Sequence, residues 1–325
     1  MASQLEMFPS PRGSDENTVV TLRPTRRRKD EKQLDYEEMT RRLEESGNYR
    51  VLRRLIARDV VSEPRPGFPR VGVLVDTETT GVDHRKDEII EIGAVAFTFD
   101  DEGNIGDVTG VYGGLQQPMK PIPPEITRLT GITDEMVAGQ MIDVGELRSL
   151  IDPADLIIAH NAAFDRPFCE AFSSMFAGKA WACSLAEVDW AARGFEGTKL
   201  GYLIGQSGCF HHGHRAVDDC FALLAVLEHA GSGGGRCPFG ELLESSQGSR
   251  VRVFAEHSPF DMKDQLKSRG YRWSDGSDGR PKCWWIEVEE QRLNEEIGFL
   301  RSEIYRWAEA DPPVKHLTAF DRYKA

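Results

Sequence analysis

The sequence predicts an α/β fold with a mixed central sheet, because three consecutive strand patterns are followed by alternating helix and strand patterns. The first three strands are expected at 71–76, 89–99 and near 108–115, where apolar residues form runs bounded by turn residues. Sheets that combine consecutive strands with strands separated by helices are typically mixed.

The bulk properties indicate a cytoplasmic protein with no membrane partner. No stretch among the 325 residues approaches the ~20 apolar residues of a membrane helix, and the N-terminus lacks the pattern of a secretory signal. The six cysteines are scattered, which suits a reducing compartment better than a disulfide scaffold. The net charge of −13 weighs only weakly against a nucleic-acid ligand, because carboxylates that hold a metal are counted as bare negatives.

The segment before the central domain divides into two parts. Residues 1–34 are polar and without periodicity, which predicts a disordered tail. Over 35–66 we expect a short helical segment and a connector, with two short helices separated at Gly47.

A central domain is predicted over 67–230. Its later elements are expected to alternate between helices and short strands. Helices are expected after Pro123 and Asp143, at 163–176, after Ser184 and Lys199, and from 215 to 230, and strands at 156–159 and 180–183.

A linker is predicted over 231–249 because it begins with Gly-Ser-Gly-Gly-Gly. Beyond it, 250–325 predicts a small α/β module. Its strands are expected at 250–256 and 283–288, and its helices at 262–269 and 290–307.

The first strand ends in Asp76-Thr-Glu78, and side chains two apart on a strand project to the same face. Two carboxylates so close repel each other and do not both ionise cheaply. A divalent cation resolves that conflict, and oxygen ligands suit magnesium or manganese. The sequence therefore predicts a metal site at this strand end.

Three further residues complete a pattern. Asp165 opens a helix in Asn161-Ala-Ala-Phe-Asp165, and Asp219 opens the last helix of the domain, five residues after His214. This ordered set resembles the DEDDh family of 3′-5′ exonucleases, which includes the proofreading (epsilon) subunit of bacterial DNA polymerase III. The resemblance covers about residues 71–230. Arg215 stands where a sister class carries a tyrosine, which favours the histidine class.

The resemblance implies a ribonuclease H-like exonuclease fold that releases 5′-mononucleotides from 3′ ends of DNA, in proofreading or repair. It implies that two Mg²⁺ or Mn²⁺ ions are held by Asp76, Glu78, Asp165 and Asp219, and that His214 deprotonates the attacking water.

His214 and Asp219 are five positions apart, and positions five apart lie on different faces of an ideal helix. We therefore expect His214 on a mobile loop before the helix.

Four residues are candidates for substrate binding: Thr79, Val82, His160 and Asn161. His160 can equally serve packing, Asn161 can cap the following helix, and Val82 can be an ordinary surface residue. Cys209, His211 and His212 form a dense cluster with His214, but the spacing does not match a structural zinc site.

The two ends carry weaker signals. Gln4-Leu5-Glu6-Met7-Phe8 resembles the peptide with which bacterial polymerase-associated proteins bind the sliding clamp, so Gln4, Leu5 and Phe8 are candidate clamp contacts. In the C-terminal module, basic residues interleaved with aromatics suit single-strand binding. Of its paired tryptophans, Trp285 is expected in the core and Trp284 is left open.

Three alternatives remain open at this point. The chain can be an exoribonuclease on single-stranded RNA, a phosphatase on small nucleotides, or a non-catalytic adaptor of a polymerase or clamp. The intact set of carboxylates argues against an adaptor.

Overall fold

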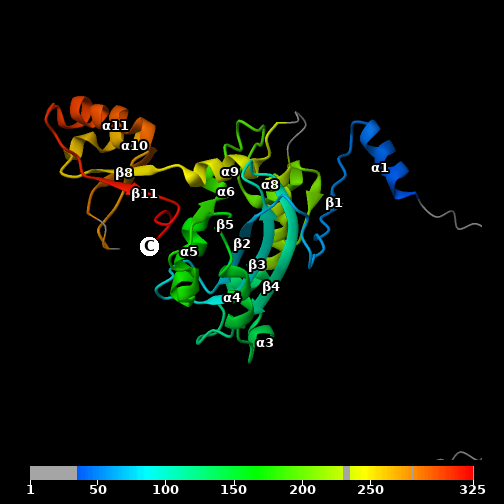
Figure 1. Ribbon diagram of the computed structural model, residues 1–325. Coiled ribbons are helices and arrows are strands. Elements are labelled where there is room, and N and C mark those ends of the chain that lie inside the picture. Colours follow the sequence, from blue (N-terminus) through cyan, green and yellow to red (C-terminus); the bar gives the residue numbers. More distant parts are fainter. Residues whose placement is uncertain (1–34, 230–234, 278, 280, 325) are drawn as a thin grey trace, which may run out of the picture. The chain divides into compact units, whose positions relative to one another are not determined.

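The computed structural model describes residues 35–229, 235–277, 279 and 281–324 (Figure 1). The expected disordered tail at 1–34, the candidate clamp residues Gln4, Leu5 and Phe8, and residues 230–234 of the expected linker lie outside the described residues. The chain divides into two compact units, and the division in the sequence falls between Val51 and Leu52.

The first unit contains helix α1 (Tyr36–Glu45). The Asp35 side chain caps it by accepting hydrogen bonds from the backbone N–H groups of Glu37 and Glu38. The helix stops before Gly47, which has φ of +71°. This first helix agrees with the sequence prediction.

The second helix expected before residue 60 does not form. Instead, β1 (Arg53–Arg54) pairs in parallel with β7 (Cys209–Phe210). Leu55 follows β1 and packs against the core of the central domain. Pairing with a strand distant in sequence, together with this burial, outweighs the helical spacing of the apolar residues.

The central sheet has five strands in the order β4-β3-β2-β5-β6. The first three strands run antiparallel to one another, and β5 and β6 run parallel to β2. The predicted α/β fold with a mixed sheet is therefore confirmed. The bounds are β2 (Arg70–Thr79), β3 (Ile89–Phe99), β4 (Ile105–Leu115), β5 (Leu156–Ala159) and β6 (Trp181–Cys183).

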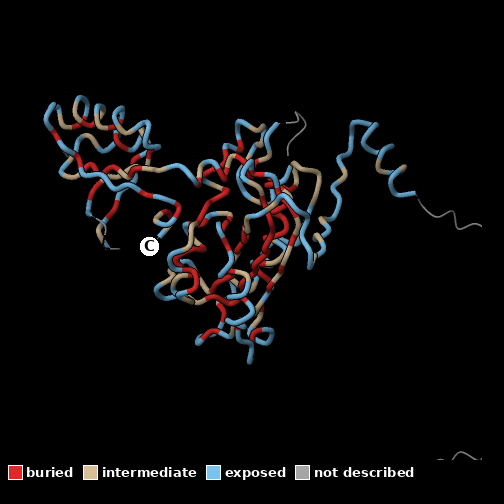
Figure 2. The backbone as a smooth tube through the Cα atoms, viewed as in Figure 1, coloured by how far each residue is buried: buried red, intermediate tan, exposed pale blue. Residues whose placement is uncertain are grey.

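Helices cover both faces of this sheet, and every residue of β3 is buried (Figure 2). One apolar core lies between the sheet and helices α7, α8 and α9, and a second lies against α4 and α5. The helix bounds are α2 (Pro124–Thr130), α3 (Asp134–Val137), α4 (Val144–Ile151), α5 (Ala162–Phe172), α6 (Ser184–Glu187), α7 (Leu200–Gln206), α8 (Ala216–Glu228) and α9 (Pro238–Gln247), with a 3₁₀ turn at Ser174–Phe176.

Helix α9 corrects the expectation of a linker over 231–249. Phe239, Leu242 and Leu243 of α9 are fully or almost fully buried. The Phe239 ring packs edge-on against Phe97 and Phe99 of β3, at centroid distances of 5.3 and 5.1 Å. The Gly-rich start of this segment led to the prediction of a linker, although the residues after it form an amphipathic helix whose apolar face belongs to the central core.

A second sheet follows, with the strand order β11-β8-β10-β9. Helices α10 and α11 contribute to its own apolar core, in which Val251, Val253, Leu266 and Leu300 are buried. The expected long helix over 290–307 is divided into a 3₁₀ turn (Glu290–Arg292), α11 and a π-helical stretch (Leu300–Tyr305). The other bounds are β8 (Arg250–Ala255), a 3₁₀ turn (Phe260–Met262), α10 (Lys263–Ser268), β9 (Arg272–Trp273), β10 (Trp284–Glu289), α11 (Leu293–Phe299) and β11 (Val314–Leu317).

The paired tryptophans lie on opposite faces of β10, as strand alternation requires. Trp284 packs against the core of the second sheet. Trp285, expected in that core, lies instead beneath the guanidinium groups of Arg252 and Arg272, whose Cζ atoms are 4.7 and 5.7 Å from its ring centroid. These arginines compete for the ring surface on which a base would stack.

The segment after β11 returns to the central sheet. The backbone N–H of Trp181 in β6 donates to the carbonyl of Ala319 over 2.9 Å. Arg166 of α5, fully buried, donates to the carbonyl groups of Ala319, Phe320 and Arg322. The segment 318–324 is therefore anchored to the central domain through its backbone carbonyl groups and the side chains of Arg322 and Tyr323, while Phe320 stays exposed. No helix in the described part of the chain is long and apolar enough to cross a membrane.

Candidate metal centre

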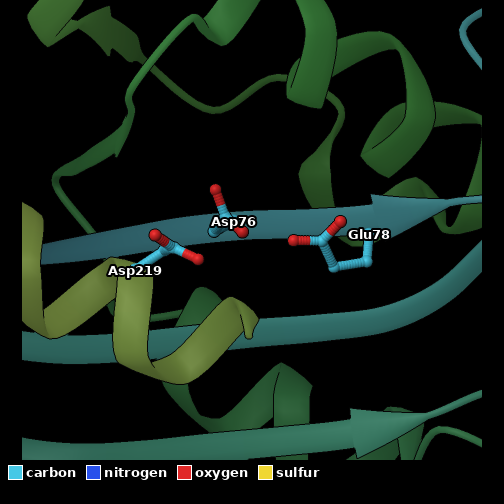
Figure 3. A group of neighbouring side chains, drawn as sticks. All are labelled: Asp76, Glu78 and Asp219. Carbon is cyan, nitrogen blue, oxygen red and sulfur yellow. The ribbon is translucent and has the colours of Figure 1, made fainter. Parts of the chain in front are cut away.

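Three carboxylates gather at the end of β2 (Figure 3). Asp76 and Glu78 come from the strand, and Asp219 comes from the first turn of α8. One carboxylate oxygen from each lies within 4.8 Å of the others. The same-face projection predicted for Asp76 and Glu78 thus places both next to Asp219.

A glycine allows helix α8 to come this close. Gly93 of β3 is the register partner of Asp76, and a Cβ atom on it would lie 2.4 Å from the carbonyl carbon of Ala216. No larger residue fits without moving the helix start. The first turn of α8 therefore sits against the strand next to β2, which brings Asp219 to the site.

Glu91 anchors the same helix start. Its carboxylate accepts hydrogen bonds from the Arg215 guanidinium, at 2.8 Å for the shortest, and from the backbone N–H of Ala216 at 3.1 Å. Glu91 is buried, and this pairing satisfies its charge. Arg215, which occupies the position of the tyrosine in the sister class, is therefore paired with Glu91.

Asp165 lies on α5 beside this group but is bound to β2 itself. Its Oδ1 accepts hydrogen bonds from the backbone N–H of Thr77 at 3.1 Å and from the Thr77 hydroxyl at 2.8 Å. Burial raises the pKa of Asp165 to about 7, although both hydrogen bonds act in the opposite direction. Asp165 is not among the three carboxylates that converge within 4.8 Å.

The electrostatics of the group suit a cation. Burial, followed by the charges of Asp165, Asp219 and Glu78, raises the pKa of Asp76 well above its ordinary value. Burial and the charges of Asp219 and Glu91 raise the pKa of Glu78 to about 8. Crowded carboxylates with such pKa values favour binding either protons or a divalent cation. The donor set consists of hard oxygens, which fits magnesium or manganese.

His214 lies on the loop before α8, which begins at Ala216. This is the location expected from the five-residue spacing. His214 has φ of +64°, its side chain is half exposed, and its Nδ1 is 3.9 Å from Oε1 of Glu78. A histidine in the left-handed region is uncommon, and the mobility of this loop stays a prediction.

The four candidate substrate-binding residues have different surroundings. Val82 is 84% exposed, whereas Thr79 is buried and its hydroxyl donates to the Gly81 carbonyl. Both ring nitrogens of His160 are engaged, with the Ser184 hydroxyl and the Thr198 carbonyl, each at 2.8 Å. Asn161 occupies the N-cap position of α5, but its side chain makes no capping hydrogen bond. The alternative of a capping side chain is therefore wrong: Asn161 lies in a left-handed turn with φ of 90°, and its substrate-binding role stays a prediction.

Sequence reasoning missed the residues that support the carboxylates. Thr77, Glu91 and His211 contact Asp165, the start of α8 and Asp219 respectively. Thr77 lies between Asp76 and Glu78, so its opposite-face projection could have signalled contact with another element. Glu91 and His211 have no signal of that kind. The backbone partner of Glu91 is 125 positions away in the sequence, and His211 is one of three histidines in the same loop, with nothing in the sequence to distinguish it.

Comparison with known proteins identifies the family of this chain. A family model described as "Exonuclease" (RNase_T) matches residues 73–227. The DNA polymerase III subunit epsilon of Treponema pallidum is 31% identical over 175 residues, which are 50% of this chain and 79% of that protein. This chain belongs to the exonuclease family.

The other similar proteins differ in length from this exonuclease. PolC-type DNA polymerase III of Clostridium perfringens is 31% identical over 176 residues, but the match spans only 12% of that protein. Among solved structures, Exonuclease X in complex with 5′-overhanging duplex DNA has 23% identity and a TM-score of 0.37, covering 52% of this chain and 99% of that one. E. coli ExoI in a complex with single-stranded DNA has 14% identity and a TM-score of 0.48, with 72% and 71% covered.

The raised pKa values predict how the metal-free exonuclease responds to pH. Glu78 shifts from 4.5 to about 8 and Asp165 from 3.8 to about 7, so the folded state binds protons that the unfolded chain has already released. The contribution of these two carboxyl groups to the stability of the folded state is therefore fully present below about pH 4 and is lost as pH rises toward 8. Mn²⁺ should raise the thermal midpoint by more at pH 8 than at pH 6. Thermal scans with EDTA or Mn²⁺ measure this, and an equal Mn²⁺ effect at both pH values would contradict it.

Proposed function

We propose that this exonuclease is a divalent-metal-dependent enzyme that removes 5′-mononucleotides from the 3′ ends of DNA, in proofreading or repair. The observation that carries the proposal is the convergence of Asp76, Glu78 and Asp219, with His214 at the edge of the group. The similarity to a subunit of a DNA polymerase supports DNA as the substrate. The 3′-5′ polarity rests on the resemblance to the DEDDh family.

The carboxylates are proposed to hold two Mg²⁺ or Mn²⁺ ions. Asp76, Glu78 and Asp219 converge, and Asp165 lies beside them on α5. When bound, such ions favour the ionised form of water and stabilise negative charge on the attacking and leaving oxygens. Thr77 keeps the Asp165 carboxylate oriented, and Glu91 keeps the start of α8 in place.

His214 is proposed to accept the proton of the attacking water. Its half-exposed ring can meet a substrate that enters from solvent, and it lies on the Glu78 side of the carboxylates. Histidine is the side chain that enzymes use most often to accept or donate a proton in this way. Val82, exposed beyond the strand end, is proposed to contact the terminal base. Since both nitrogens of His160 are engaged within the protein, we assign that residue to packing around α5.

The proposed partners are the 3′ end of DNA and a polymerase or sliding clamp, the clamp through the Gln4–Phe8 peptide. RNA is the alternative substrate that the experiment must include, because the 2′-hydroxyl is the group that lets a protein distinguish RNA from DNA.

A time course on labelled oligonucleotides tests the proposal. Single-stranded, matched and mismatched 3′ ends of DNA are compared with single-stranded RNA, with the label at either end. We expect Mg²⁺-dependent shortening from the 3′ end of DNA with release of 5′-mononucleotides, and no shortening in EDTA. Shortening from the 5′ end, faster turnover of RNA, or hydrolysis of a mononucleotide ester without shortening would each overturn the proposal.

A further inference from the structure

His211 is placed against the metal centre, although its position in the sequence gives no indication of this. It lies three residues before His214, on the loop between β7 and α8, and its side chain is only 8% exposed. Its Nε2 is 2.8 Å from Oδ1 of Asp219. The neighbouring His212 is exposed.

The protein holds both oxygens of the Asp219 carboxylate. Oδ1 contacts His211, and Oδ2 accepts the backbone N–H of Arg215 at 3.1 Å. An ionised carboxylate only accepts hydrogen bonds, so Nε2 carries the proton in this contact. Each carboxylate oxygen retains a further lone pair, which leaves Asp219 able to bind a cation while its orientation is fixed.

The His211 loop is in turn held by a strand from outside the matched family region of 73–227. The backbone N–H of Arg53 donates to the Gly208 carbonyl at 2.9 Å, and that of Leu55 donates to the Phe210 carbonyl at 2.8 Å. Leu55 is also packed against the central core. The segment that precedes the exonuclease domain therefore fixes the strand that leads into His211.

We infer that His211 is a positioning residue, which orients the Asp219 carboxylate toward Asp76 and Glu78 through its Nε2–H donor. β1 supports this function by fixing the loop. The inference rests on the proposed metal centre. A histidine that donates to a ligating carboxylate shapes metal affinity without touching the metal or the substrate.

Mn²⁺ binding to the full-length protein without nucleic acid tests the inference, followed by titration calorimetry or by the loss of the free Mn²⁺ resonance. His211→Leu keeps an apolar side chain of useful size but removes the donor, and we expect ~10–100-fold weaker Mn²⁺ binding. His211→Gln restores an N–H donor near the position of Nε2, and its affinity should stay within a few-fold of the parent. His212→Leu, the exposed neighbour, should bind as the parent does.

The outcomes are distinguishable. Equal affinity of His211→Leu and His212→Leu would overturn the positioning function, and so would a His211→Gln variant as weak as His211→Leu. If the parent itself does not bind Mn²⁺, the proposed metal centre fails and this inference fails with it. Circular dichroism checks that each variant is folded, and His211→Ala replaces the leucine variant if the latter does not fold.

Discussion

Asp76→Asn should reduce divalent-metal-dependent release of nucleotides by ~10³-fold or more, which corresponds to ~4 kcal/mol of transition-state stabilisation. Burial raises the pKa of Asp76 the most, and the negative charges of the four neighbouring acidic residues raise it further. Asp76 therefore interacts with every other carboxylate of the group: Asp165, Asp219, Glu78 and Glu91. Asparagine has nearly the same shape but removes the negative charge that attracts a cation.

The same substitution should make the metal-free protein more stable. Burial and like charges raise the pKa of Asp76, so the ionised side chain destabilises the folded state at neutral pH. Asp76→Asn removes that repulsion. Loss of activity together with a higher thermal midpoint in EDTA would separate a site defect from unfolding.

Initial rates with Mg²⁺ and thermal scans in EDTA measure both effects. Asp218→Asn is the matched control, because Asp218 is exposed and immediately precedes Asp219. We expect that variant to keep the parent's rate. A folded Asp76→Asn variant that retains Mg²⁺-dependent activity would refute the assignment of this residue.

Arg322→Ala should destabilise the protein by about 3 kcal/mol, because it removes one partner of a buried ion pair. Arg322 is 1% exposed, and its Nη1 donates to Oε2 of Glu187 and to the Ser245 carbonyl, both at 2.9 Å. Its Nη2 donates to the Gly248 carbonyl. Glu187 would keep hydrogen bonds from Tyr323 and Ser245 but lose its only cationic partner among the described residues.

Denaturant unfolding of the full chain measures the change. Lys324→Ala is the matched control, since Lys324 is exposed and two residues away. Arg322→Lys keeps the charge without the guanidinium fork, and we expect an intermediate loss of stability. Equal unfolding midpoints for Arg322→Ala and Lys324→Ala would show that the ion pair contributes nothing to stability.

The sequence was sufficient for features that depend on local patterns. The first three strands of the central sheet follow from runs of apolar residues bounded by turn residues. The same-face projection of Asp76 and Glu78 follows from the strand period of two. The loop location of His214 follows from helix geometry. Each of these inferences required only the spacing of residues within one element.

Features that depend on contacts between different elements of the fold could not be inferred from the spacing of residues within one element. α9 was concealed by a Gly-rich start, and its burial depends on Phe97 and Phe99 of β3. β1 exists because β7 offers it carbonyl groups. His211 became recognisable only when Asp219 was seen at 2.8 Å. For α9 and β1 the deciding partner lies far away in the sequence. For His211 the partner is eight residues away, but no pattern in the sequence marks the contact.

The return of residues 318–324 to α5 and β6 has a consequence for the order of folding. Arg166 and the carbonyl groups it binds are 153–156 positions apart in the chain. During synthesis, α5 therefore leaves the ribosome long before the segment that covers Arg166, and the whole second sheet is made in between. Long-range contacts of this kind form late in folding. Until they form, the helix that carries Asp165 also carries an uncovered arginine, so the nuclease domain becomes complete only after the module that follows it has been translated.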